Sequence, residues 1–167
     1  MMTGIVAIVG GTNSGKTTLM EKLIPELMRR GYRVGTIKHI MHKMVFDPSA
    51  KDSRRHAEAG ADTVVVDADT NIVMFKSVAG NTESTDHVRN YVSAYFSDMD
   101  IVLAEGYKKQ DLPKIEVYRQ NDRTNPVCLT DANLVALVTD ADLDAGVPRY
   151  GLDDVISITD LIVKTAG

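Results

Sequence analysis

The residues from Gly10 to Thr17, which read GGTNSGKT, match G-x-x-x-x-G-K-[ST], the pattern of a phosphate-binding loop. Glycine permits backbone conformations that other residues avoid, so the N–H groups of such a loop can turn inward around a phosphate. In this pattern the lysine reaches the outer phosphates and the hydroxyl residue after it holds Mg²⁺. We therefore expect a nucleotide to be bound by these residues: Gly10, Gly11, Thr12, Asn13, Ser14, Gly15, Lys16, Thr17 and Thr18.

The segments on both sides of the loop have the secondary structure that this chemistry requires. Ile5 to Val9 is a short apolar run, rich in β-branched residues and typical of a buried strand. From Lys16 to about Arg30 the apolar residues recur at helical spacing, and Gly31 is a suitable C-terminal stop. A helix that starts at the loop presents unpaired N–H groups and a positive dipole end to an anion. Strand, glycine loop and helix in this order distinguish a phosphate-binding loop from an ordinary glycine-rich turn.

Two carboxylates are candidates for the metal site. Glu105 ends the apolar run 101–104, and an acidic residue at the end of a buried strand orients Mg²⁺ or its water in such sites. The alternative is a strand-end carboxylate that simply reaches solvent. Asp52 follows the strand predicted at 33–37 and is either a magnesium or switch carboxylate or the N-cap of the next helix. We predict Thr17, Asp52 and Glu105 as metal-site residues, and Lys16 and Glu105 as catalytic residues.

Further candidates for ligand contacts lie in a polar segment, 38–53, and at the end of a strand. His39 and His42 either hold a metal with a nearby aspartate or hydrogen-bond a phosphate, a pterin or the loop itself. Asp140 is placed to pair with the N1–H and amino group of guanine; Asp142 is a second candidate, and an Asx-type turn is the alternative. Three basic residues either contact an anionic ligand or form a solvated charged face: Lys38, Arg54 and Arg55.

The predicted elements alternate between strands and helices along the chain. A short polar turn joins strands predicted at 63–66 and 71–75, so this pair is expected to be antiparallel. The remaining predictions are a short helix capped by Ser53 and closed by Gly60, a helix at 85–96, strands at 100–104, 114–118, 134–139 and 155–158, and a terminal helix capped by Thr159 or Asp160. We predict a single α/β domain, 1–167: a three-layer P-loop NTPase sandwich, mostly parallel with one antiparallel excursion.

Composition narrows the functional classes. The chain has 167 residues and a formal net charge of −4, which argues against broad nucleic-acid binding because that requires a basic face. The N-terminal apolar run is too short to span a membrane and has no basic region before it. The single cysteine, Cys128, excludes an internal disulfide and suits a reducing cytoplasm, where we expect the protein to reside.

Several short motifs occur in one order along the chain, as far as about Arg119: GGTNSGKTT at 10–18, TIKH at 36–39 with His42, KDS at 51–53, AGA at 59–61, AEGYK at 104–108 and PKIE at 113–116. In this order they resemble one family, the molybdopterin-guanine dinucleotide biosynthesis protein B (MobB) family. Ala50 departs from the family pattern, which has glycine there.

This resemblance implies a function. Members of such a family bind GTP with Mg²⁺, hydrolyse it slowly at best, and form homodimers with joined sheets. They assist the guanylyltransferase MobA, which attaches GMP to molybdopterin, and molybdopterin-bearing proteins are further possible partners. The chain is thus expected to be an adaptor that binds GTP, at most a slow GTPase, with no nucleic-acid or membrane partner.

Two other interpretations remain open at this point. A small-molecule kinase is often a P-loop domain of this size, but it needs several arginines on a lid, and after Glu105 only Arg119, Arg123 and Arg149 remain, scattered along the chain. A metallochaperone-type GTPase would use His39 and His42 as ligands.

Overall fold

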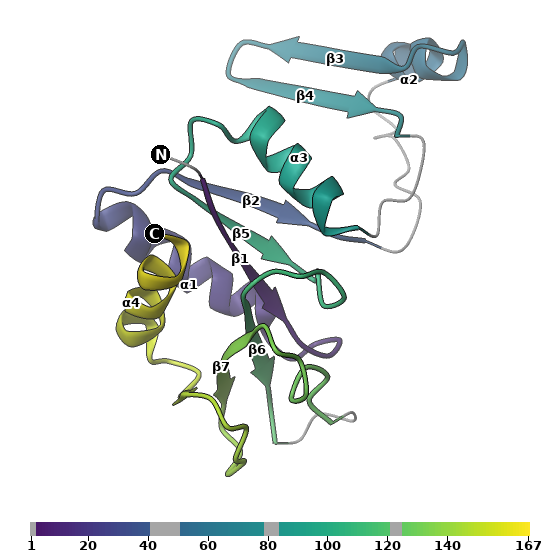
Figure 1. Ribbon diagram of the computed structural model, residues 1–167. Coiled ribbons are helices and arrows are strands. Elements are labelled where there is room, and N and C mark those ends of the chain that lie inside the picture. The colour runs from purple at the N-terminus through teal and green to yellow at the C-terminus, as the bar shows by residue number, and fades with distance from the viewer. Residues whose placement is uncertain (1–2, 41–50, 79–83, 121–124) are drawn as a thin grey trace. The chain divides into compact units, whose positions relative to one another are not determined.

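The computed structural model describes residues 3–40, 51–78, 84–120 and 125–167. The contacts divide the chain into two compact units, one formed by 1–40 with 83–167 and the other by 41–82 (Figure 1). In the first unit, the elements are β1 (Gly4–Val9), α1 (Lys16–Arg29), β2 (Val34–Lys38), α3 (Thr85–Tyr95), β5 (Ile101–Glu105), β6 (Lys114–Tyr118), β7 (Leu134–Thr139), β8 (Arg149–Tyr150) and α4 (Val155–Ala166).

The strands of the first unit form one parallel sheet in the order β2-β5-β1-β6-β7-β8. β1 lies at the centre, with β5 on one side and β6 on the other. Because all strands run the same way, their carboxyl ends meet at one edge, where ligands bind in open α/β sheets. The loop after β1 and the residues that end β5 and β6 therefore share this edge.

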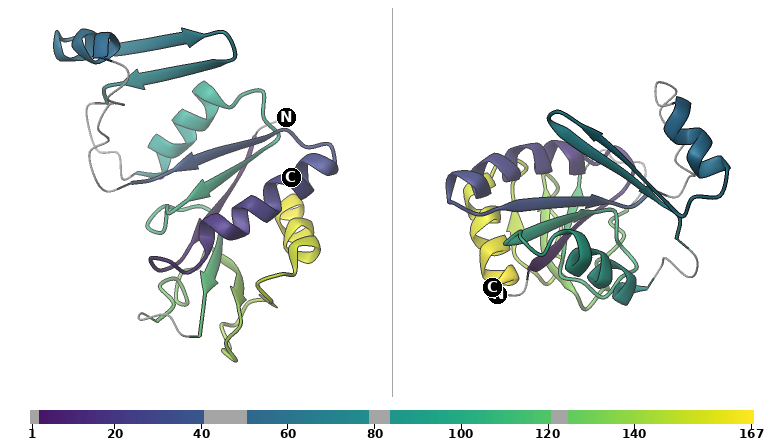
Figure 2. Two further views of the ribbon diagram at one scale, coloured as in Figure 1. Left: turned by 180° about the vertical axis from the view of Figure 1, so that it is seen from behind. Right: turned by 90° about the horizontal axis from the view of Figure 1, so that it is seen from above.

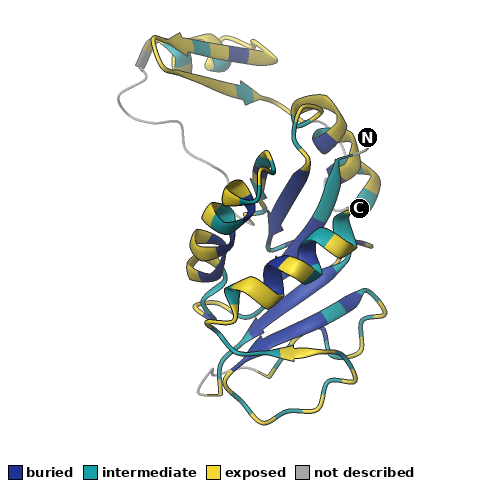
Figure 3. Cartoon of the chain, turned by 90° about the vertical axis from the view of Figure 1, so that its left-hand side faces the viewer, coloured by how far each residue is buried: buried dark blue, intermediate teal, exposed yellow. Residues whose placement is uncertain are grey.

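Helices cover both faces of this sheet (Figure 2). The leucines of α1, together with Ile158 and Ile162 of α4, pack with alternate side chains of β1, β5, β6 and β7 in a buried cluster. The opposite face packs against α3 through Val88 and against the segments around Leu112 and Cys128. The central strands are accordingly buried, while the outward faces of the helices are exposed (Figure 3). This confirms the predicted three-layer α/β sandwich.

The second unit consists of α2 (Lys51–Glu58) and the hairpin of β3 (Thr63–Ala68) and β4 (Asn71–Lys76). β3 and β4 pair antiparallel along their whole length, from Thr63 opposite Lys76 to Ala68 opposite Asn71, which confirms the predicted antiparallel excursion. The two strands form a separate two-stranded sheet.

Two sequence predictions need correction at the C-terminal end. Residues 155–158 are not a strand but the first turn of α4. The N-cap of this helix is therefore Asp154 and not Thr159 or Asp160. The β-branched run favours a strand locally, but Ile158 and Ile162, four residues apart, are both fully buried against the sheet. This burial at helical spacing decides the conformation, because packing overrides local propensity. The last strand is instead the short β8, which pairs with β7.

Candidate functional site

The loop between β1 and α1 has the backbone that its sequence predicts. Gly10 and Gly15 have φ of 141° and 101°, and Asn13, a residue type that tolerates the left-handed region, has φ of 65°. Such turns direct successive N–H groups to one side and create a concavity for an anion. The loop begins tightly against β6, since a Cβ on Gly10 would lie 2.2 Å from the Val117 carbonyl oxygen.

Helix α1 begins directly at the loop and its first turn is open to an anion. Its N-cap is Gly15, no side chain caps it, and its first turn contains no acidic residue. The first N–H groups of a helix have no partner within the helix, and its dipole favours negative charge there. The Lys16 ammonium folds back onto the loop and donates to the carbonyls of Gly10, at 3.4 Å, and Gly11, at 2.5 Å.

The Ser14 side chain adds an observation that the sequence did not suggest. Its hydroxyl is fully buried and is the only buried side-chain polar atom without a hydrogen-bond partner in the described part of the chain. A Cβ on Gly10 would lie 2.8 Å from this oxygen, so the hydroxyl lies within the curve of the loop. Such unsatisfied buried hydroxyls are rare in folded proteins and cost stability.

Glu105 and Thr17 come together at the carboxyl edge of the sheet. Glu105 ends β5 and is buried, and the Thr17 hydroxyl donates to its Oε1 at 3.3 Å. The Lys38 ammonium, at the end of β2, lies 3.0 Å from the same oxygen. The pairing of Lys38 with Glu105 in the β2–β5 register explains this contact. A cavity of about 270 Å³ opens beside these three side chains, between α1 and β2.

The other predicted residues have different surroundings. His39 donates its backbone N–H to the Glu105 carbonyl at 3.0 Å, and its ring packs against Tyr107 with the centroids 5.4 Å apart. The Asp140 carboxylate accepts the Gln120 N–H at 2.8 Å, and Asp142 lies 2.7 Å from Arg149. Asp140 thus has a polar partner just after the end of β6, and Asp142 has one at the start of β8.

The remaining candidates belong to the second unit or lie outside the described residues. Asp52 is exposed in the first turn of α2, 4.0 Å from Arg55, and Arg54 pairs with Glu58. His42 and Arg123 lie outside the described residues. Within the described ranges, no three His, Cys, Asp or Glu side chains come close enough to hold a metal ion together.

Arg119 contacts the loop between β1 and α1, which sequence reasoning did not predict. It directly follows β6, and its Nε donates to the Ser14 carbonyl of the loop at 3.2 Å. The signal was available, because a residue just after a parallel strand lies at the same edge as the loop after a neighbouring strand. The sequence analysis did not connect this arginine with the loop, because 105 positions separate it from Ser14.

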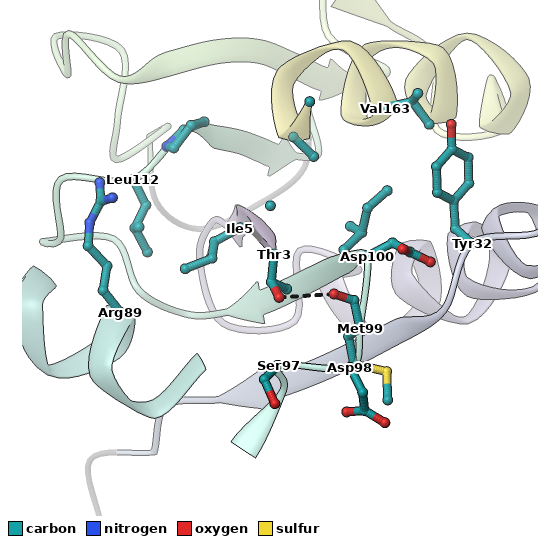
Figure 4. Close-up of a pocket in the computed structure, with 15 residues that line it drawn as sticks. Thr3, Ile5, Tyr32, Arg89, Ser97, Asp98, Met99, Asp100, Leu112 and Val163 are labelled. Atoms are coloured by element: carbon teal, nitrogen blue, oxygen red, sulfur yellow. Dashed lines mark hydrogen bonds between the residues drawn. The ribbon is translucent and has the colours of Figure 1, made fainter. Parts of the chain in front are cut away.

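A cavity of about 700 Å³ lies at the opposite edge of the sheet, where the strands begin (Figure 4). Its lining includes Thr3, whose hydroxyl donates to the Met99 carbonyl at 2.9 Å. Hydrogen bonds within the chain thus already engage this hydroxyl. The phosphate-binding loop lies at the other edge, so we place the functional site there.

Comparison with known proteins fits this geometry. The family model described as "Molybdopterin guanine dinucleotide synthesis protein B", MobB, matches residues 5–140. The chain belongs to the MobB family. It is 36% identical over 161 residues to the molybdopterin-guanine dinucleotide biosynthesis adapter protein of Haemophilus influenzae, covering 95% of this chain and 86% of the relative. It is 30% identical to the adapter protein of the same name from Escherichia coli, covering 98% and 93%.

Solved MobB structures share the fold. A crystal structure of molybdopterin-guanine biosynthesis protein B superposes with a TM-score of 0.75 at 28% identity and covers 96% of this chain and 97% of that one. The MobB homologue from Bacillus stearothermophilus gives a TM-score of 0.64 at 25% identity, covering 97% of each chain. Family membership places the chain among the adapter proteins of molybdopterin-guanine dinucleotide biosynthesis. None of its described helices has the length and apolarity needed to cross a membrane.

Proposed function

We propose that this protein is a GTP-binding adapter that assists the guanylyltransferase MobA during molybdopterin-guanine dinucleotide biosynthesis and hydrolyses GTP slowly. The observation that carries nucleotide binding is the loop from Gly10 to Thr17, with left-handed backbone at three positions and an uncapped, acid-free helix start behind it. Family membership supports the pathway, and the choice of GTP, the partner and slow turnover rest on the resemblance to this family.

Each side chain at the loop has a definite role in this proposal. Loop N–H groups and the α1 N-terminus bind the phosphate tail, and Lys16 leaves the loop carbonyls to neutralise the outer phosphates. Thr17 and Glu105 would hold Mg²⁺, directly or through water, and the ion would supply further charge neutralisation. Any rate enhancement is then electrostatic, because these groups stabilise charge where it develops.

The decisive experiment is calorimetric titration of the purified protein with GTP, ATP and GDP in the presence of Mg²⁺. We expect micromolar or tighter binding of GTP that Lys16→Ala abolishes. Lys22, an exposed lysine on the same helix as Lys16, pairs with Asp153, and Lys22→Ala should bind like the wild type. Absence of heat with every purine nucleotide would overturn the proposal. Turnover is then measured alone and with MobA; fast hydrolysis of ATP in preference to GTP would also contradict it.

We also propose a homodimer joined through the second unit. In the β3–β4 hairpin Val64 is buried on one face, while Val65, Ile72 and Met74, which share the other face, are 55%, 71% and 42% exposed. A two-stranded sheet with an apolar exposed face and two open edges is marginal alone and favours pairing with another chain. The β2 strand is likewise an edge of the large sheet.

The dimer is tested by light scattering during size-exclusion chromatography. We expect wild type and Thr70→Ala, in the hairpin turn, to be dimeric, and Val65→Asp with Met74→Asp to shift the protein towards monomer. A monomeric wild type would refute the proposal.

A further inference from the structure

Arg119 lies against the phosphate-binding loop at the point where α1 begins. Its Nε donates to the Ser14 carbonyl at 3.2 Å, and a Cβ on Gly15 would lie 3.2 Å from its Nη2 and 3.3 Å from its Nε. The guanidinium thus lies against the Ser14–Gly15 peptide and occupies the space that a side chain would need at Gly15. Lys16, whose ammonium is the established cation of such loops, is the next residue.

The chain on both sides of Arg119 is anchored, so the guanidinium is positioned by the fold. On its N-terminal side, β6 pairs with β1 and β7, and Glu116 is fully buried and accepts the N–H groups of Val127, at 2.5 Å, and Cys128, at 2.9 Å. On its C-terminal side, the Gln120 N–H donates to the Asp140 carboxylate. Asp140, at the end of β7, therefore helps to hold Arg119 beside the loop.

The chemistry of the group suits a phosphate tail. A guanidinium remains charged at any physiological pH and has five N–H donors, one of which donates to the Ser14 carbonyl. Phosphate oxygens accept such donors in short, charge-assisted hydrogen bonds.

We propose that Arg119 is a second cationic residue of the nucleotide site, which contacts the phosphate tail beside Lys16 and holds the loop through Ser14. This inference rests on the proposed nucleotide binding and adds a residue to it. The half-buried guanidinium contacts the loop at Ser14 and Gly15 from the end of β6, whereas Lys16 reaches the loop from α1. The loop is then flanked by positive charge from two elements of the fold.

The test compares three substitutions at Arg119 by calorimetric titration with GDP and GTP in the presence of Mg²⁺. Arg119→Ala is expected to weaken binding of both nucleotides about tenfold or more, the effect of losing a charge-assisted hydrogen bond. Arg119→Lys keeps the charge and should stay within a few fold of wild type. Arg119→Gln keeps a donor for the Ser14 carbonyl but no charge, and should resemble Arg119→Ala. Arg89→Ala, an exposed arginine of α3, is the charge-matched control and should bind like the wild type.

The outcomes separate this inference from the function on which it rests. If wild type binds no nucleotide, the proposed function fails and this inference with it. If wild type binds GTP, Lys16→Ala does not, and Arg119→Ala equals wild type, this inference alone is refuted. Full binding by Arg119→Gln together with weak binding by Arg119→Lys would also refute it, because Arg119 would then only brace the loop. Thermal unfolding without nucleotide should leave all variants within about 4 °C of wild type, since this one part-buried hydrogen bond contributes about 1 kcal/mol.

Discussion

A buried ion pair at the start of β6 allows the sharpest prediction about stability. Lys114 is 1% exposed at its side chain, lies 2.9 Å from the Asp131 carboxylate and donates to the Gln110 carbonyl. The Asp131 side chain is 26% exposed. These contacts give the PKIE motif a structural role, because they anchor the start of β6, and Arg119 directly follows the end of that strand.

The two single substitutions should differ in magnitude. Asp131→Ala leaves the ammonium of Lys114 buried without its counter-charge, and we expect a loss of about 3 kcal/mol in the free energy of unfolding. Lys114→Met keeps the volume of the side chain and removes the buried charge, so we expect a loss of about 1 kcal/mol or less. The double variant should resemble Lys114→Met, because no buried charge is left to lose its partner.

The measurement is urea unfolding followed by far-ultraviolet circular dichroism, since the chain has no tryptophan. Amide hydrogen exchange in β6 checks that the transition reports the large sheet. Equal losses of 3 kcal/mol or more in both single variants would refute the reasoning, because the pair itself would then stabilise the fold. No loss in Asp131→Ala would show that water solvates Lys114.

The same pair predicts a pH dependence. Partial burial alone would raise the pKa of Asp131, but hydrogen bonds from Lys114 and the Asn133 N–H outweigh it and hold that pKa below its usual range. A carboxyl whose folded-state pKa is lowered stabilises the fold above its unfolded pKa and loses that contribution as the pH falls through the folded pKa. The stability difference between wild type and Asp131→Asn should therefore be constant near neutral pH and shrink below about pH 4.

Three further predictions concern the site and the thiol. Replacing Lys38 with methionine removes the ammonium 3.0 Å from Glu105, so the Mg²⁺ concentration that half-saturates nucleotide binding should fall severalfold; an unchanged or higher value in calorimetry contradicts this. Gly15→Ala places a Cβ on a backbone with φ of 101° and 3.2 Å from Arg119, so GTP binding should be lost, and retained affinity would refute the loop geometry. Burial raises the pKa of Cys128 to about 11, so its reaction with a disulfide reagent at pH 8 should be about 100-fold slower than in urea; equal rates would show an open site.

The sequence by itself determined the centre of the molecule. The loop from Gly10 to Thr17 could be read because its conformation depends on residues adjacent in the chain, and the strand before it and helix after it follow from short-range periodicity. The placement of Glu105 at a buried strand end was predictable for the same reason. The α/β class and the antiparallel hairpin followed from the alternation of elements and one short turn.

Only the tertiary structure decided which distant side chains meet. Arg119 contacts Ser14 across 105 positions of the chain, and Lys38 pairs with Glu105. Both contacts depend on the order of strands in the sheet, which periodicity does not specify. The helical state of 155–158 was likewise set by burial of Ile158 and Ile162 against the sheet. Asp140, interpreted from its position as a guanine contact, holds the Gln120 N–H because β6 and β7 end side by side. Such contacts arise from packing between elements, and a single chain read in order carries no direct record of them.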